Sequence, residues 1–240
     1  MSILSSVLKT TRCPFVTAVI VAGGSGTRFG GDKLMAELAG EPVLLHTLRA
    51  FHNSPMIQEI ILVTREESMT DMGRLCKAHE LTKVNLVVAG GATRALSSYA
   101  GVMAASEKAG IIAIHDGARP LVTEKIIEDA VWNAYRHTAA VPAVPVRDTI
   151  KKAVKGVVTE TPERNGLYAV QTPQCFQADL IRTALADVVK NAPDVTDDCL
   201  AVERLGGKIR LTEGSEENLK ITTPLDLALA EIILKGRNTL

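Results

Sequence analysis

The residues with the clearest capacity for chemistry lie between positions 21 and 33, in the stretch "VAGGSGTRFGGDK". Glycines are concentrated there, and two cations, Arg28 and Lys33, stand among and after them. Glycine lets backbone N–H groups approach an anion closely, and nearby cations strengthen the attraction. The stretch also ends an apolar, strand-like run that begins at Thr17. It therefore predicts a site for a phosphate-bearing ligand at the end of a strand.

Three classes of phosphate-binding loop compete for this stretch. A P-loop needs a hydroxyl residue after its lysine, and this sequence has none there. A dinucleotide fingerprint needs G-x-G-x-x-G, whereas Gly24, Gly26 and Gly30 are spaced one residue too widely. The third class is the G-x-G-T/S-R loop with a downstream lysine found in nucleotidyltransferases, in which Arg28 and Lys33 would flank a triphosphate. A tight turn with solvated cations is the alternative that involves no ligand.

The rest of the chain supplies more polar segments at the ends of strand-like runs. "AGG" ends the third run, "HDGARP" the fourth, and "RDT" follows the fifth. Their alternation with amphipathic segments predicts a doubly wound, mostly parallel α/β sheet with helices on both faces. In such sheets ligands bind at the carboxyl ends of the strands, so these loops should meet there. The expected strands are 17–23, 57–65, 83–91, 111–117 and 139–146, and the expected helices between them 42–53, 66–80, 92–110 and 123–137.

Residues 147–175 interrupt this alternation. They show no helical period, and two short β-like runs flank Gly156. We expect a β-hairpin arm that projects from a single domain of residues 1–240. Because an isolated two-stranded hairpin is marginally stable in water, the arm should pack on something, and a second subunit is the expected partner. Helices over 177–192, 196–206 and 224–236 and a strand over 208–214 complete the pattern.

Composition narrows the classes of function. The 27 basic and 27 acidic side chains of the 240 residues balance, which argues against a nucleic-acid partner. No apolar run reaches the length of a membrane span or of a signal peptide, so we expect no membrane association and a cytoplasmic protein. The four scattered cysteines indicate reduced thiols rather than a metal site.

Taken together, the motifs resemble the 2-C-methyl-D-erythritol 4-phosphate cytidylyltransferase family. The resemblance extends from about Val16 to Leu234, in the segments "AGGSGTRFGGDK", "AGGATRALSS", "IHDGARP", "PVRDTIK", "RNGLYAVQTPQCF", "TDD" and "NLKITTPLDLALAE". It implies a Rossmann-like fold of the nucleotide-diphospho-sugar transferase type and a homodimer formed through the arm. The implied reaction is magnesium-dependent transfer of CMP from CTP to 2-C-methyl-D-erythritol 4-phosphate in non-mevalonate isoprenoid biosynthesis. Its products are 4-diphosphocytidyl-2-C-methyl-D-erythritol and pyrophosphate.

The resemblance also assigns roles by position. The catalytic cations would be Arg28, Lys33 and Lys220, together with Arg164 contributed by the partner's arm. CTP would be bound by Ala22, Gly23, Gly24, Gly91, Ser97, Asp116 and Gly117. The polyol phosphate would lie near Arg119, Thr149, Thr172 and Thr196. Asp116 is the candidate magnesium ligand.

Several competing functions stay open on the sequence. Ribitol 5-phosphate cytidylyltransferases share the glycine loop and "QTPQ", and Ala92 removes one acceptor that could recognise the cytosine amino group. A sugar-1-phosphate nucleotidyltransferase and a non-catalytic nucleotide-binding protein also compete. His115 is interpreted as a structural histidine, and the Thr196 hydroxyl is a candidate cap of the next helix. The attacking group is already an anionic phosphate, so the reaction requires no general base.

Overall fold

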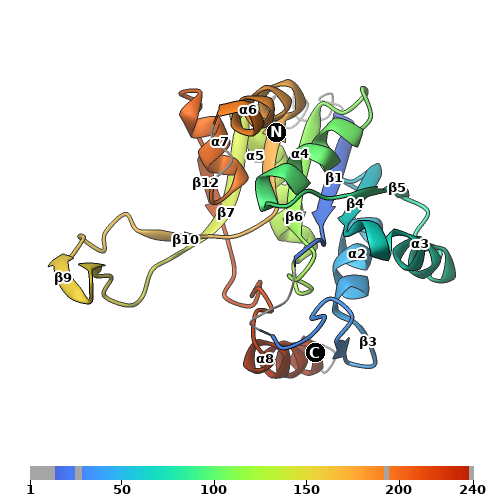
Figure 1. Cartoon of the computed structure of the whole chain (residues 1–240), viewed down its shortest axis with the longest axis horizontal. Helices are drawn as coiled ribbons and strands as arrows, with labels where there is room; N and C mark the ends of the chain where they lie inside the picture. The colour runs from blue at the N-terminus through green and yellow to red at the C-terminus, as the bar shows by residue number, and fades with distance from the viewer. Residues whose placement is uncertain (1–13, 25–28, 192–194, 238–240) are drawn as a thin grey trace, which may run out of the picture.

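The computed structural model describes residues 14–24, 29–191 and 195–237. Within this part of the chain, an eight-stranded sheet forms the centre, in the order β10-β7-β11-β6-β1-β4-β5 with β12 beside β7 (Figure 1). Its parallel central strands are β1 (Val16–Val21), β4 (Glu59–Thr64), β5 (Val84–Ala89) and β6 (Ile111–Asp116). Strands β1, β4 and β6 are buried at almost every position, as continuous apolar runs covered on both faces should be. The predicted α/β fold class is confirmed.

The antiparallel strand pairs lie on the side of β6 that faces away from β1, toward the edge strand β10. β11 (Gln174–Gln177) runs antiparallel to both β6 and β7 (Ala139–Pro145), and β10 (Tyr168–Val170) runs antiparallel to β7. β12 (Arg210–Glu213) is parallel to β7. Neither β10 nor β11 was predicted from the sequence, because both are short and lie next to prolines and polar residues, without a clear apolar period.

Helices cover both faces of the sheet. Alternate residues of β1 point to opposite layers: Ile20 packs in the core that includes α2 and α5, and Val19 packs in the core that includes α4 and α6. Strand pleating requires this alternation. The helices are α2 (Val43–Asn53), α3 (Met69–Ala78), preceded by the 3₁₀ turn η1 (Glu66–Ser68), α4 (Arg94–Ala104), α5 (Glu124–His137), α6 (Ala178–Asn191), α7 (Asp198–Arg204) and α8 (Pro224–Arg237).

Most predicted helices are confirmed, but α4 ends six residues before the predicted Gly110. Ala105 adopts an extended conformation, and the next backbone N–H, that of Ser106, donates to the buried Glu59 carboxylate at 2.9 Å. Because this N–H binds Glu59 of β4, it does not continue the helical hydrogen-bond ladder, and α4 ends at Ala104.

Helix α8 lies apart from the sheet, beyond the carboxyl ends of β1 and β6 (Figure 1). Its buried Ala230 belongs to a small core with Leu38, Val43 and Ile221. This core also includes residues next to the two-residue strands β2 (Glu37–Leu38) and β3 (Glu41–Pro42). This small core therefore joins α8 to β2 and to the start of α2.

The predicted arm is present. β8 (Lys152–Val154) and β9 (Val157–Glu160) form an exposed antiparallel hairpin, with Gly156 at a φ of 81° in its turn. The hairpin forms its own sheet and extends away from the main body (Figure 1). Left-handed φ values favour glycine, which explains the residue at this turn.

The state of the cysteines and the character of the helices bear on two expectations from the sequence, reduced thiols and no membrane span. Cys76, Cys175 and Cys199 are buried free thiols, and burial raises the pKa of Cys76 to about 11. Cys13 lies outside the described residues. In the same described ranges, no helix combines the length and apolar character needed to cross a membrane.

A pair of glycine substitutions tests the packing of α4 on the sheet. A Cβ at Gly101 would lie 2.3 Å from Cγ1 of Val19 and 2.6 Å from Cγ2 of Val63. We therefore expect Gly101→Ala to lower the free energy of unfolding in urea by about 1–3 kcal/mol, because it overfills the core. Gly73→Ala in α3 is the control: its Cβ meets nothing within 4 Å, so stability should hold or rise by up to about 1 kcal/mol. Equal effects at both sites would contradict this packing.

Candidate active site

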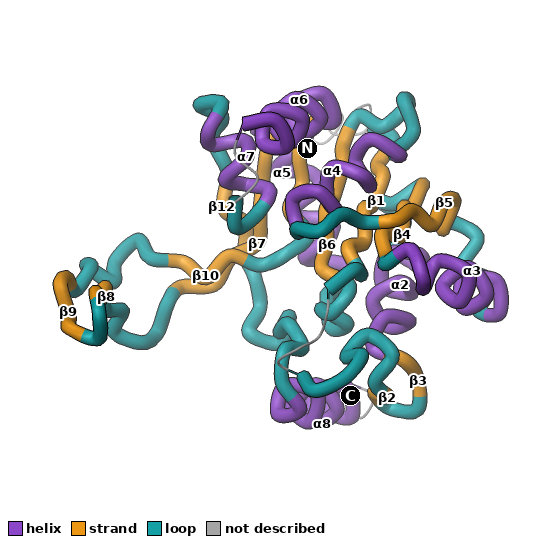
Figure 2. Tube along the Cα trace, in the orientation of Figure 1, coloured by secondary structure: helices purple, strands orange, loops and turns teal. Residues whose placement is uncertain are grey.

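A cavity of about 500 Å³ opens at the carboxyl ends of the central strands. Its lining residues come from the loops after β1, β5 and β6 and from the segment that leads into α8. Figure 2 shows the course of these loops at this edge of the sheet. The described residues that line it are Val21, Ala22, Gly23, Gly24, Lys33, Leu34, Gly91, Ala92, Thr93, Arg94, Ser97, Asp116, Ala118 and Lys220. Eight of the positions predicted from the sequence are among them: Ala22, Gly23, Gly24, Lys33, Gly91, Ser97, Asp116 and Lys220.

The wall formed by the loop after β5 depends on two glycines and one serine. A Cβ at Gly90 would lie 2.7 Å from Oγ of Ser97, and a Cβ at Gly91 would lie 2.4 Å from Cβ of Leu96. Oγ of Ser97 accepts from the Gly91 N–H at 3.2 Å and lies 3.0 Å from the Thr93 carbonyl. Glycine is therefore needed at Gly90 and Gly91 for this turn to pack against Leu96 and Ser97.

The next residues place the amino end of a helix at the cavity. Thr93 is the N-cap of α4, and its hydroxyl accepts from the Leu96 N–H at 3.2 Å. Ala92, Thr93 and Arg94 all line the cavity. The free N–H groups and dipole of a helix amino end favour anions and electron-rich atoms.

Lys33 lines the cavity from a turn whose flanking residues, Asp32 and Leu34, are fixed by contacts. The Asp32 carboxylate accepts from the Leu34 N–H at 3.1 Å, and its second oxygen lies 3.3 Å from Nη2 of Arg65. Leu34 itself is buried, which anchors the turn. Arg28, the other predicted cation of this loop, lies outside the described residues.

Asp116, at the end of β6, is the carboxylate around which the cations of the cavity gather. Its Oδ2 lies 2.8 Å from Nζ of Lys220 and 3.6 Å from Nε of Arg119, and its Oδ1 lies 3.5 Å from Nε of Arg94. Burial raises the pKa of Asp116, but Lys220, Arg94 and Arg119 together outweigh burial and hold the pKa well below its usual value. Asp116 is therefore ionised at neutral pH, and its charge is shared among three cations.

The backbone of β6 is fixed by a separate hydrogen-bond chain. The Thr172 hydroxyl accepts from the Asp116 N–H at 3.2 Å and donates to Nδ1 of the buried His115 at 2.9 Å. Nε2 of His115 in turn donates to the Arg119 carbonyl at 3.2 Å. Burial lowers the pKa of His115 to about 3, so its ring stays neutral. These bonds confirm that His115 is a structural histidine. They also engage the Thr172 hydroxyl in two hydrogen bonds within the protein.

Lys220 lies on a loop that is held by hydrogen bonds on both sides of this residue. The Ile221 N–H donates to the Ala118 carbonyl at 2.8 Å, next to Asp116. Asn218 is fully buried, and its carbonyl accepts from Nη1 of Arg119 at 2.6 Å. The amino end of α8 then begins just beyond Lys220, so the ammonium reaches the cavity from a fixed segment.

Arg94 is a site residue that was not predicted from the sequence. Its guanidinium lies between two carboxylates: Nε is 3.5 Å from Asp116 Oδ1, and Nη1 is 2.8 Å from Oδ2 of Asp198. Burial lowers the pKa of Arg94, but Asp198 and Asp116 outweigh burial and raise it above its usual value. Asp198 is almost completely buried, and burial raises its pKa against the opposing effect of Arg94. The motif "ATRALSS" contained this arginine, but nothing in its spacing showed which carboxylates it would meet.

Several predicted positions lie elsewhere. Thr149 and Arg164 are exposed on the arm segment, and Nη1 of Arg164 donates to the Arg147 carbonyl at 2.8 Å. Thr196 is exposed, and it does not cap α7: the N-cap is Asp197, whose carboxylate accepts from the Leu200 N–H at 2.9 Å. The capping suggestion for Thr196 is therefore wrong.

Gly117 and Arg119 follow Asp116 and are packed into the protein beside the cavity. Gly117 is buried, and a Cβ there would lie 3.1 Å from both Leu44 Cδ1 and the Val21 carbonyl, so glycine is needed for close packing. The Arg119 guanidinium is largely buried against Asp116 and Asn218. Neither is among the described residues that line the cavity, and their ligand-binding roles remain predictions.

The carboxylates define which metal the site could accept. Across residues 14–24, 29–191 and 195–237, no cluster of three or more His, Cys, Asp or Glu side chains could hold a metal ion. Asp116 is the single carboxylate among the described lining residues. Mg²⁺ is commonly held by one or two carboxylates, water and substrate phosphates. The described lining therefore offers one carboxylate, Asp116, to a magnesium ion that phosphate ligands would mainly hold.

Comparison with known proteins gives one consistent result. The family profile described as 2-C-methyl-D-erythritol 4-phosphate cytidylyltransferase matches residues 16–236. The chain is 42% identical to a protein of that name from Caldanaerobacter subterraneus subsp. tengcongensis, over 92% of this chain and 99% of the relative. It is 43% identical to one from Bacillus velezensis, over 92% and 96% of the two chains.

Solved structures agree with these sequence matches. The crystal structure of 4-diphosphocytidyl-2C-methyl-D-erythritol synthase from Anaerococcus prevotii superposes with a TM-score of 0.82 at 30% identity, covering 93% of this chain and all of that one. The 2-C-methyl-D-erythritol 4-phosphate cytidylyltransferase from Thermus thermophilus gives a TM-score of 0.75 at 30% identity, over 90% and 98% of the two chains.

The neutral state of His115 can be tested directly. Because the folded protein lowers the pKa of His115 to about 3, ¹⁵N NMR of the imidazole should show the neutral Nε2–H tautomer throughout the range from about pH 5 to 8. The unfolded protein in urea should titrate near pH 6.5 and serves as the control. Between these values the unfolded state binds more protons, so His115 should lower stability as pH falls below about 6.5. A folded-state midpoint above about pH 6 would contradict the hydrogen-bond assignment.

Proposed function

The chain belongs to the 2-C-methyl-D-erythritol 4-phosphate cytidylyltransferase family, and from this premise we propose how its cavity performs the reaction. The enzyme transfers the cytidylyl group of CTP to 2-C-methyl-D-erythritol 4-phosphate in non-mevalonate isoprenoid biosynthesis. The buried free thiols suit a reducing compartment, so the proposed place of action is the cytoplasm.

The observation that carries the proposal is the arrangement of charge around Asp116. One buried carboxylate holds Lys220 at the cavity, and Lys33 lines the same cavity from the glycine loop. Cytidine would lie against the turn of Gly91 and Ser97, where glycine permits close backbone approach. The triphosphate would then lie toward Lys33 and Arg28, along Ala22, Gly23 and Gly24.

The reaction needs charge rather than a proton shuttle. The phosphate of the acceptor is already an anion, and His115 is neutral, buried and occupied by two hydrogen bonds. What opposes the reaction is the repulsion between two polyanions. Unit charges about 4 Å apart interact by roughly 4 kcal/mol at an effective dielectric of 20, compared with about 1 kcal/mol in water. Fixed cations in a partly enclosed cavity therefore offset a substantial repulsion.

Each cation has a proposed task. Arg28 and Lys33 would bind the triphosphate and stabilise the charge that develops as pyrophosphate leaves. Lys220 would hold the α-phosphate or the incoming phosphate. Magnesium, held by the phosphates and by Asp116, would supply additional positive charge to the triphosphate. Arg119, Thr172 and Thr196 are proposed to shape the subsite for the polyol phosphate.

The arm is proposed to complete the site of a second copy of the chain. Arg164 and Thr149 lie on exposed arm segments, and the hairpin exposes Val154, Val157 and Val158. Apolar side chains that a hairpin leaves exposed favour contact with a partner subunit. A homodimer in which each arm reaches the other cavity would bring Arg164 to the acceptor phosphate.

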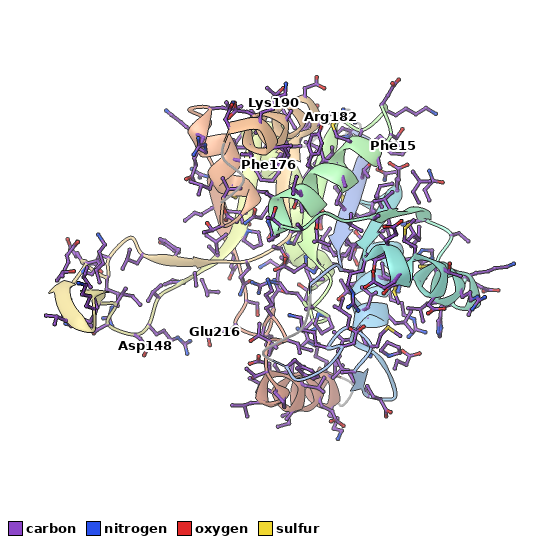
Figure 3. All side chains as sticks on the ribbon, viewed as in Figure 1. Phe15, Asp148, Phe176, Arg182, Lys190 and Glu216 are labelled. Atoms are coloured by element: carbon purple, nitrogen blue, oxygen red, sulfur yellow. The ribbon has the colours of Figure 1, made fainter. Side chains whose placement is uncertain are left out.

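An activity assay tests the proposed site. With CTP, Mg²⁺ and methylerythritol phosphate, the protein should release pyrophosphate, whereas ribitol 5-phosphate should give little product. Lys33→Ala should lower turnover by about 10²–10³-fold, because it removes a donor aimed at the transition state. Lys190→Ala is the control: Lys190 is exposed on α6, at the other end of the sheet from the cavity (Figure 3). Equal turnover in a folded Lys33→Ala protein would refute the assignment, and turnover with ribitol phosphate alone would refute the acceptor.

Mixing two inactive variants tests the arm. Lys33→Ala damages the cavity, and Arg164→Ala damages the arm, so each homodimer should be nearly inactive. If arms act across the dimer, a heterodimer has one cavity in which Lys33 and a partner Arg164 are both intact. Co-expression at equal levels should then restore about a quarter of wild-type activity, since about half the dimers carry one such site. No recovery in verified heterodimers would show that Arg164 acts within its own chain, and an active Arg164→Ala homodimer would show that it does not act at all.

A further inference from the structure

Asp198 is a buried carboxylate that the proposed reaction does not use. It is the first residue of α7, it is 1% exposed, and its Oδ2 lies 2.8 Å from Nη1 of Arg94. Arg94 faces the cavity on its other side and approaches Asp116. Asp198, Arg94, Asp116 and Lys220 therefore form a continuous chain of alternating charges, from the protein interior to the cavity.

The position of Asp198 is fixed by hydrogen bonds from a side chain of the neighbouring strand β11. Oε1 of Gln174 accepts from the N–H groups of Asp198 at 3.0 Å and Cys199 at 3.1 Å. Nε2 of the same Gln174 donates to Asp197 Oδ2 at 2.9 Å. One side chain of β11 thus sets where α7 begins, and with it where the Asp198 carboxylate lies.

The segment around Gln174 consequently reaches Asp116 by two routes. The Thr172 hydroxyl accepts from the Asp116 backbone N–H, and Gln174 reaches the Asp116 side chain through Asp198 and Arg94. The backbone and the carboxylate of Asp116 are thereby both attached to the short segment 172–174. This double attachment would be unnecessary if Asp116 served only to end β6.

Stability alone gives a weak reason for this arrangement. The desolvation cost of a buried ion pair often equals or exceeds its Coulomb gain, and well-packed apolar residues can replace such pairs without loss. A guanidinium that contacts carboxylates on two sides offers geometric control instead, because its planar donors have a fixed arrangement. Here the second carboxylate is the one that holds Lys220.

We propose that Asp198 is a positioning residue of the reaction, which holds Arg94 against Asp116 and thereby fixes the Lys220 ammonium in the cavity. The inference rests on the proposed function of that cavity. Asp198 touches no substrate in this mechanism and acts only through Arg94. Loss of its charge leaves Arg94 free to move, the Asp116 carboxylate free to rotate, and Lys220 without a fixed partner geometry.

A double-mutant cycle tests the route through Arg94. Asp198→Asn should lower kcat by about tenfold, while the Kd of CTP measured by calorimetry changes by less than about threefold. Arg94→Gln should lower kcat at least as much, and adding Asp198→Asn to Arg94→Gln should cause no further loss. A purely structural role predicts instead that the two losses multiply and that the melting temperature falls in parallel.

The matched control is Glu203→Gln, which removes a charge from the exposed face of the same helix and leaves the hydrogen bonds of Gln174 intact. It should leave kcat within about twofold of wild type. Multiplying losses in the cycle, or equal kcat values for Glu203→Gln and Asp198→Asn, would overturn the proposal. Should Asp198→Asn not fold, Arg94→Lys replaces it: an ammonium lacks the planar fork, so kcat should fall about fivefold or more, and wild-type kcat would overturn the proposal.

The wild-type assay separates the two levels of inference. Failure of wild-type protein to release pyrophosphate from CTP and methylerythritol phosphate would count against the proposed function of the cavity. Full wild-type activity, together with a Lys33→Ala loss and no effect of Asp198→Asn, would count against the positioning role alone.

Discussion

A carboxylate that shares its charge with three cations is the constraint on which this active site depends. Asp116 is nearly buried, yet Lys220, Arg94 and Arg119 keep it ionised. An acidic group in a cavity for two polyanions would be repulsive if it stood alone. In the proposed reaction it would instead hold the cations in place before the anions arrive, so little reorganisation would be left for the reaction itself.

The fold supplies that constraint from distant parts of the chain. β6 provides Asp116, α4 provides Arg94, and the segment before α8 provides Lys220, which are all brought to the carboxyl edge of one sheet. Parallel strands end at the same edge, so their loops converge without special design. The antiparallel β11 adds a second attachment, because it fixes the amino end of α7 and hence Asp198. Packing of these elements thus determines the charge distribution at the cavity.

The sequence predicted the parts of this arrangement that have local signals. The buried strands β1 and β6 follow from uninterrupted apolar runs and the helix α5 from its amphipathic pattern, and the glycine loops mark the strand ends. The Arg94–Asp198 pair could not be predicted in the same way, since each residue alone is ordinary at the start of a helix, and their contact depends on how α4 and α7 pack. The short strands β10 and β11 and the early end of α4 also depend on tertiary partners, such as the Glu59 carboxylate.

A crystal structure with CTP and Mg²⁺ bound tests the central claim most directly. We expect phosphate oxygens within hydrogen-bond distance of Lys33, cytosine against the turn of Gly91 and Ser97, and Lys220 still paired with Asp116. Nucleotide bound elsewhere on the molecule, or an Asp116 carboxylate turned away from Lys220 in the complex, would contradict it.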